Sequence, residues 1–167
     1  MLPILNSKQI KLADEYTIEH EPITSIDLME RASVKCVEWL KKHYSLKQKF
    51  TIICAQGNNG GDGLAIARML HFAGYNVCVF VLQANTKGSD DFEINLNRLQ
   101  NLLEVTYLHE DKNEINISED SIVIDAIFGI GLNKPITNWI ANVVQQINKL
   151  NNTVISIDMP SGLFADK

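Results

Sequence analysis

Short runs rich in Val and Ile alternate with longer amphipathic segments from residue 50 onward. The runs that fit buried strands are residues 50–55, 76–82, 104–108, 121–126 and 153–158. The segments with apolar residues at helical spacing are 62–74, 89–103 and 137–150. Strands that alternate with helices of this length indicate a parallel sheet covered on both faces. We therefore predict an α/β fold with three αβα layers, Rossmann-like, around a mostly parallel sheet.

Two further helices are predicted in the first 45 residues, before the alternating pattern begins. Asn6 with Gln9 three residues later is typical of a helix start, and Pro22 breaks the chain. Thr24 or Ser25 then caps a second helix. The apolar face that we predict for this second helix consists of Leu28, Ala32, Cys36 and Leu40.

The composition is that of an ordinary globular protein and limits its partners. With 167 residues, 46% of them hydrophobic and 21% charged, the chain makes about one domain with a real core. Lys and Arg number 15 against 20 Asp and Glu, a net charge of −5, which argues against broad binding of nucleic acid. An anionic ligand would need backbone amides and one or two local cations.

The compartment follows from what the sequence lacks. Lys8, Lys11 and Asp14 interrupt the N-terminal segment too early for a signal peptide, and no run approaches the roughly 20 apolar residues of a membrane span. Three separated cysteines in apolar contexts predict buried, reduced thiols: Cys36, Cys54 and Cys78. We predict a cytoplasmic protein that does not bind a membrane.

A Gly- and Asn-rich segment at residues 57–63 separates the first predicted strand from the helix that follows. Such a turn leaves backbone N–H groups free at the positive end of a helix, and so invites an anion. Its four glycines let a ligand approach the backbone closely. A tight turn without any ligand is the alternative, because Gly and Asn are common turn residues.

The segment matches neither of two well-known phosphate loops. A Walker loop needs Lys and then Ser or Thr after its last glycine, whereas Asp62 and Gly63 follow Gly61. The dinucleotide fingerprint needs a different glycine spacing and an acid at the end of the second strand, where the chain has Gln83. These mismatches argue against an ordinary NAD-dependent dehydrogenase, while a nucleotide-like ligand stays open.

Two more polar segments follow apolar strands, at residues 125–135 and 156–163. Ligands of open parallel sheets bind beyond the carboxyl ends of the strands, where both segments and the Gly-Asn segment would lie. Asp125 or Asp158 alone is as well explained as a helix cap or a turn former, and Ser161 as a turn hydroxyl. Three such segments at one edge of the sheet favour a binding site.

Read together, these segments resemble the NAD(P)H-hydrate epimerase family, also described as the YjeF N-terminal domain. The likeness spans nearly the whole chain in order and spacing, and the residues that carry it are 28–32, 57–63, 125–131 with Pro135, and 157–162. The resemblance implies one domain over residues 1–167. Family members continue past the segment at 160–162, so we expect the C-terminal part of the domain to be missing. A dehydratase domain that follows on the same longer polypeptide is an open alternative.

The resemblance implies an isomerase that interconverts the R and S forms of hydrated NADH and NADPH, so that a dehydratase can remove the water. The implied substrate contacts are Asn58, Asn59, Gly60, Gly61, Asp62, Gly129, Ile130, Gly131, Leu132, Asn133, Lys134, Pro135 and Asp158. One potassium ion per subunit is implied, held by Asn59, Asp125 and Ser161. These oxygen donors suit a hard cation. The N-terminal helices resemble those that pair subunits in the family, which implies a homodimer.

The substrate's chemistry assigns a role to one acid. A hydroxyl on the carbon beside the ring nitrogen is a hemiaminal, which inverts by loss and return of the hydroxyl or by ring opening, and either route moves a proton. Asp158 is the candidate acid–base group, because a positioned carboxyl can contribute about 10²–10⁴-fold. Two alternatives are a non-catalytic nucleotide-binding module and a protein-interaction module of the same fold.

Overall fold

The structure is a computed structural model that describes residues 4–84 and 86–166. Its helices are α1 (Ser7–His20), α2 (Ser25–His43), α3 (Asn58–Phe72), α4 (Asp90–Gln100) and α5 (Asn138–Lys149). Its strands are β1 (Lys49–Ala55), β2 (Asn76–Leu82), β3 (Val105–Leu108), β4 (Ser121–Ala126) and β5 (Val154–Ser156). The predicted elements are all present, and among the described residues no helix combines the length and apolar character needed to cross a membrane.

The strands form one sheet in the order β3-β2-β1-β4-β5, and every pairing between them is parallel. Strands β1 and β4 are almost wholly buried, as expected for central strands rich in Ile and Val. The order reverses at β1, from which the chain winds first toward β3 and later toward β5. Such a switch point is where open α/β sheets form their ligand sites. The predicted α/β fold class is confirmed.

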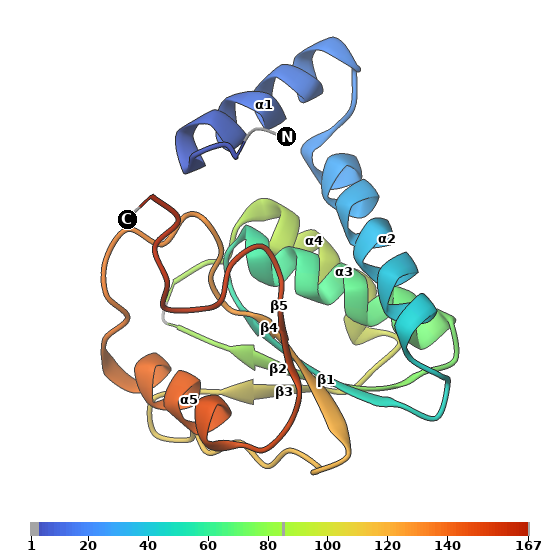
Figure 1. Ribbon diagram of the computed structural model, residues 1–167, viewed down its shortest axis with the longest axis vertical. Coiled ribbons are helices and arrows are strands. Elements are labelled where there is room, and N and C mark those ends of the chain that lie inside the picture. The colour runs from blue at the N-terminus through green and yellow to red at the C-terminus, as the bar shows by residue number, and fades with distance from the viewer. Residues whose placement is uncertain (1–3, 85, 167) are drawn as a thin grey trace.

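Helices cover the two faces of the sheet unequally (Figure 1). On one face α3 and α4 pack on the strands with α2 alongside, around a core that includes Phe50, Leu64 and Phe92. On the other face α5 packs alone, through Trp139 and Val143. The predicted three layers are therefore present, but among the described residues the second face has only one helix.

Helix α2 turns a different face to the core from the one predicted. Its buried residues are Met29, Ser33, Val37 and Leu40, one position further along than the predicted set except at Leu40. Ala32 is exposed and Cys36 is partly buried. The prediction chose the most apolar face of the helix. In the structure the face that carries the small Ser33 is turned to the core instead. The cap is Thr24, whose side chain accepts a hydrogen bond from the N–H of Asp27.

Helix α1 lies apart from the two cores. It begins with the predicted capping box, in which Asn6 and Gln9 each accept from the other's backbone N–H. None of its residues is buried. Its start is tied to the other end of the chain, because the N–H of Ser7 donates to Asp166 Oδ1 at 2.9 Å and the Ser7 hydroxyl donates to the same carboxylate. Figure 1 shows α1 crossing above the end of the sheet.

The three cysteines are free thiols, but they are not all buried. Cys54 is buried and Cys36 is half-buried, as predicted in kind, whereas Cys78 is exposed. The prediction for Cys78 was wrong because alternate residues of β2 point to the sheet face that α5 does not cover over that part of the strand.

Candidate functional site

The three polar segments lie side by side at one edge of the sheet. They follow β1, β4 and β5, and in the sheet β4 lies between the other two. Because all three strands run in the same direction, their carboxyl ends lie on one edge. The predicted convergence of the three segments is therefore confirmed by the topology.

The Gly-Asn segment forms the first turns of α3 rather than a loop before the helix. Helix α3 begins at Asn58, four residues earlier than predicted. A Cβ on Gly60 would stand 1.7 Å from the carbonyl oxygen of Ala55, so no other residue fits there. Gly61 and Gly63 also have neighbours within 3 Å of such a Cβ. Gly60 and Gly63 therefore serve close packing of α3 on the strands, and Gly61 its close packing on α2, and not only approach by a ligand.

Asn59 carries a polar side chain that the protein itself does not satisfy. Both its amide oxygen and its amide nitrogen are buried, and neither has a hydrogen-bond partner among the residues that the structure describes. Such groups are rare in folded proteins and call for an explanation, such as an ion or a ligand. Asn58, by contrast, is exposed at the start of the helix.

Asp125 joins the second and third segments through four hydrogen bonds. Its carboxylate accepts from the hydroxyl of Ser161 at 2.6 Å, the N–H of Ser161 at 2.9 Å, the hydroxyl of Ser156 at 3.1 Å and the N–H of Ile127 at 3.2 Å. The side chain is only 6% exposed. A buried carboxylate needs such a set of donors. Ser161 also accepts from the N–H of Phe128 at 2.9 Å, so its turn role and its place in the site coexist.

Asp158 is held at the edge of the sheet by its backbone and by one short hydrogen bond. Its φ of 64° is in the left-handed region, which Asp tolerates better than most residues. Its Oδ2 accepts from the N–H of Ile130 at 2.6 Å. A Cβ on Gly129 would stand 2.2 Å from that same oxygen, so the glycine makes the contact possible. The second and third segments are therefore locked together at Asp158.

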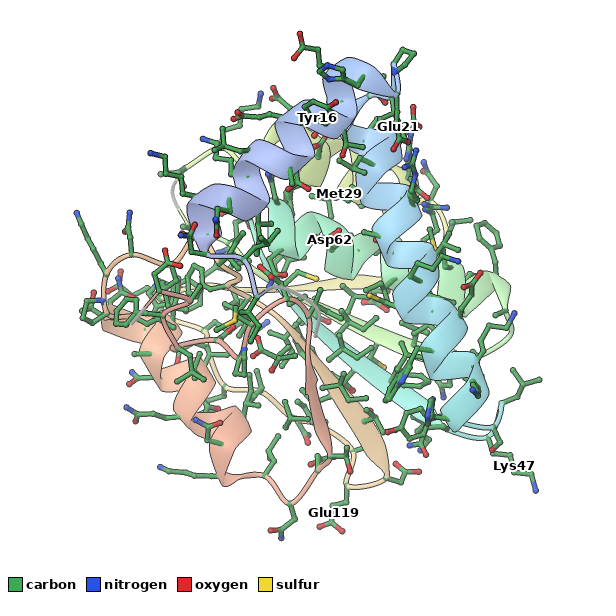
Figure 2. All side chains as sticks on the ribbon, turned by 45° about the horizontal axis from the view of Figure 1, so that its top comes forward. Tyr16, Glu21, Met29, Lys47, Asp62 and Glu119 are labelled. Atoms are coloured by element: carbon green, nitrogen blue, oxygen red, sulfur yellow. The ribbon has the colours of Figure 1, made fainter. Side chains whose placement is uncertain are left out.

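Asp62 brings the first segment into electrostatic contact with the third. Burial is the main reason that its pKa is raised from 3.8 to about 7, and the carboxylates of Asp158, Asp91 and Asp14 raise it further. Figure 2 shows Asp62 on α3 beneath α1, with Met29 of α2 nearby. Asp14, on α1, lies near the same region. Partial burial raises its pKa, and the carboxylate of Asp158 raises it further. Helix α1 thus lies over the candidate site.

The outer part of the second segment is open to solvent. Gly129 is buried, while Ile130 and Leu132 are half-buried. The remaining predicted contacts, which are exposed, are Gly131, Asn133, Lys134 and Pro135. They lie on the loop that begins at the hydrogen bond between Asp158 and Ile130.

A cavity of about 230 Å³ lies beside Asp125, under α5. Of the predicted site residues its lining includes Asp125 and Ser161, and the rest comes from α5, β5 and their neighbours. Asn59, Asp62 and Asp158 do not line it. Ligand pockets are commonly 300–1,000 Å³, so we do not place a dinucleotide there.

Two contributors to this region were missed from the sequence. Ser156 donates to Asp125, and the side chain of Gln56 accepts from the N–H of Ala84 at 2.7 Å and so joins the end of β1 to the chain beyond β2. In the structure Ser156 ends β5 and Gln56 follows β1, and their place beside the polar segments was the available signal. Hydrogen bonds bring four predicted site residues together in two pairs, Ile130 with Asp158 and Ser161 with Asp125.

The sheet order, the switch point and the polar edge define a Rossmann-like α/β domain with a candidate site at the carboxyl ends of its strands. The model of the family "YjeF-related protein N-terminus" matches residues 25–167. The NAD(P)H-hydrate epimerase of Limosilactobacillus fermentum is 33% identical over 162 residues, covering 97% of this chain and 76% of that protein. The chain belongs to the YjeF N-terminal family.

Two other similar proteins extend the comparison. The bifunctional NAD(P)H-hydrate repair enzyme Nnr of Dictyoglomus turgidum is 35% identical over 168 residues, which cover 99% of this chain and 32% of that longer protein. The crystal structure of the yeast protein YNL200c superposes with a TM-score of 0.80, at 24% identity, over 99% of this chain and 74% of that one. The structural likeness supports the fold.

Proposed function

We propose that this chain is an isomerase that interconverts the R and S forms of hydrated NADH and NADPH. Its relatives named as epimerases cover almost the whole chain at 33–37% identity in several cases. One structural observation carries the proposal, the placement of the Asp158 carboxylate. The N–H of Ile130 fixes it at the sheet edge, and it is close enough to Asp62 to raise the pKa of Asp62.

The substrate would lie across the three segments. The first turn of α3 has N–H groups without helical partners and the positive end of the helix dipole, which suit a phosphate. The contacts proposed there are Asn58 to Asp62, and those on the second segment are Gly129 to Pro135. Lys134 is exposed on that segment and offers a cation to the pyrophosphate. An exposed, partly charged edge of this kind fits a ligand larger than the cavity under α5.

Asp158 would carry the proton transfer. Its hydrogen bond to Ile130 uses Oδ2 and leaves Oδ1 for a substrate hydroxyl. Protonation of the hydroxyl on C6 lets the C–O bond break, with the ring nitrogen supplying the electron pair, and water returns to the other face of the iminium as the proton goes back to the carboxylate. Atoms and charge balance, and no redox partner is required. A positioned carboxyl supplies about 10²–10⁴-fold in such steps.

The residues proposed for potassium fit a hard cation. Asn59 has a buried amide oxygen without a partner, and Asp125 and Ser161 have oxygens 2.6 Å apart. Strand β1, which leads into the turn of Asn59, pairs directly with β4, which carries Asp125. Among the described residues no group of three or more His, Cys, Asp or Glu is arranged to bind a metal. A bound cation would add positive charge beside the nicotinamide, and Asn59 would gain its missing partner.

The test is the rate at which purified R hydrate acquires the S form, followed by chromatography or proton NMR against the spontaneous rate. Asp158→Asn keeps an acceptor for the N–H of Ile130 and tolerates the left-handed backbone, but removes the acid. We expect it to lose at least about 10²-fold in rate with the fold unchanged.

The matched control is Asp120→Asn, because Asp120 is an exposed aspartate at the opposite end of β4 that pairs with Lys49. Its rate should equal the wild-type rate. Wild-type protein that does not exceed the spontaneous rate would instead support a nucleotide-binding or protein-interaction module. Equal rates for Asp158→Asn and the wild type would remove Asp158 from the mechanism.

The remaining proposals concern partners and place. The product would pass to an NAD(P)H-hydrate dehydratase, in keeping with the longer relative that is named a bifunctional NAD(P)H-hydrate repair enzyme. A homodimer is supported by α1, which buries none of its own residues and exposes Leu12 and Tyr16. Light scattering tests it. Free cysteines agree with a reducing, cytoplasmic location.

A further inference from the structure

A fully buried amide lies behind the proposed site, on α4. Asn95 is 0% exposed. Its Nδ2 donates to the carbonyl oxygen of Gly61 on α3 at 3.3 Å and contacts Met29 Sδ on α2 at 3.3 Å. We call Met29, Gly61 and Asn95 the three-helix junction. It joins the three helices that cover this face of the sheet.

The hydrogen bonds of the junction do not explain why an amide is needed for folding. The Oδ1 of Asn95 is buried without a partner, which costs desolvation energy with no bond in return. The carbonyl of Gly61 lies inside α3, where the helix itself supplies a donor four residues later. A leucine has a similar branched shape and would leave no buried oxygen without a partner. An amide kept at such a cost calls for another role.

The contact that the amide makes is with the turn that carries the proposed substrate contacts. The carbonyl of Gly61 belongs to the same peptide group as the N–H of Asp62, so holding one orients the other. A Cβ on Gly61 would stand 2.9 Å from Met29 Sδ and 3.4 Å from the Cα of Phe92, so α2 and α4 press directly on this turn. The turn is thus fixed from behind, while its other side meets the strand ends through Gly60.

We propose that Asn95 is a positioning residue for the reaction: through the carbonyl of Gly61 it holds the first turn of α3 at the orientation in which Asn58 to Asp62 meet the same substrate as Asp158. The inference rests on the proposed function, because it concerns that same site. Asn95 itself does not touch the substrate. A shift of the order of 1 Å at such a turn is enough to misplace a bound substrate and lower its rate by about 10²-fold at most.

The experiment compares Asn95→Leu with Leu99→Ala in the epimerisation assay and in urea unfolding. Leu99 is also fully buried and lies one turn further along α4, away from Gly61. We expect Asn95→Leu to unfold at the wild-type urea concentration or higher, with kcat/KM about tenfold lower, chiefly through KM. Leu99→Ala should unfold at lower urea, because it leaves a cavity, yet keep the wild-type kcat/KM where it is folded.

Asn95→Ala, which leaves space in place of the amide, should show the same loss in kcat/KM as Asn95→Leu. Wild-type kcat/KM in Asn95→Leu overturns the positioning role, as does an equal loss in Leu99→Ala. If both Asn95 variants fail to fold, the amide is a requirement of the fold and the proposal is also overturned. A wild-type protein without epimerase activity refutes the proposed function instead, so the two failures are distinguishable.

Discussion

Replacing Asp62 with Asn should make the protein more stable at neutral and alkaline pH, although Asp62 belongs to the proposed site. Burial and three neighbouring aspartates disfavour the ionised form of this side chain in the folded state. In the unfolded chain the same carboxyl is free of both effects. The folded protein therefore binds this proton more tightly than the unfolded chain does.

The sign and the pH window follow from the two pKa values. Between pH 3.8 and about 7 the folded state holds more protons at this position than the unfolded state, so the wild type loses stability as the pH rises through that window. At 1.36 kcal/mol per unit, a rise of this size corresponds to about 4 kcal/mol. Asp62 is not completely buried, and solvent screens its neighbours, so we expect on the order of 2 kcal/mol.

The assay is urea unfolding of the wild type and Asp62→Asn at pH 4.5 and pH 8. Asn has the shape of a protonated Asp, so the two proteins should be close in stability at the lower pH and differ by about 2 kcal/mol at the higher pH, with the variant more stable. The KM of the same variant should not rise above pH 7, because an amide cannot ionise.

Asp90→Asn is the control for this measurement. Asp90 is a fully exposed aspartate at the start of α4, and its hydrogen bond with Lys87 lowers its pKa. At pH 8 Asp90→Asn should be slightly less stable than the wild type, which is the opposite sign to Asp62→Asn. The reasoning is refuted if Asp62→Asn is equal to or less stable than the wild type at pH 8.

Four other substitutions test packing, hydrogen bonding and ion pairing by urea unfolding. Gly60→Ala should cost at least about 3 kcal/mol of stability, because the new Cβ would overlap the carbonyl of Ala55. Gly131→Ala should cost under about 1 kcal/mol, because a Cβ there meets open space. Equal costs would contradict the packing role assigned to Gly60. Asp125→Asn should cost about 2–4 kcal/mol of stability, because the amide nitrogen cannot accept the hydrogen bonds that the carboxylate accepts. An unchanged urea midpoint would contradict this role of the carboxylate. Glu30→Gln should cost about 1–3 kcal/mol, because Glu30 is paired with two arginines, one of them largely buried, and a neutral effect would show that these pairs are unimportant.

Periodicity and turn residues were enough to predict the layers, the sheet and the polar edge. Residues 76–82 and 121–126 form strands with the predicted bounds, because buried strands are continuous apolar runs that end at polar residues. The helix boundary at Asn58 could not be predicted in the same way. A Gly-rich segment is a poor helix former on its own, and only its packing on the carbonyl of Ala55 makes it helical.

The hydrogen-bond partners of the polar side chains could not all be predicted from the sequence, for a different reason. That Asp125 would meet Ser156 depends on the register of β4 with β5, which aligns the two residues. Register cannot be read from two separate apolar runs. The burial of Met29 and Ser33 in place of Leu28 and Ala32 likewise reflects how α2 meets α3, where Gly61 admits a sulfur atom that no larger residue would.

The charge of the edge and the proposed substrate are consistent only if positive charge is supplied locally. Asp14, Asp62, Asp91 and Asp158 act on one another electrostatically, and the substrate carries a pyrophosphate. Four ionised carboxylates would repel it, but a proton on Asp62 near neutral pH removes one of those charges, and a cation held by Asn59 and Asp125 would offset another. Epimerisation should therefore slow above pH 7, as Asp62 ionises, through a rise in KM. A pH-rate profile of the wild type whose KM is constant between pH 6 and 9 would contradict this account.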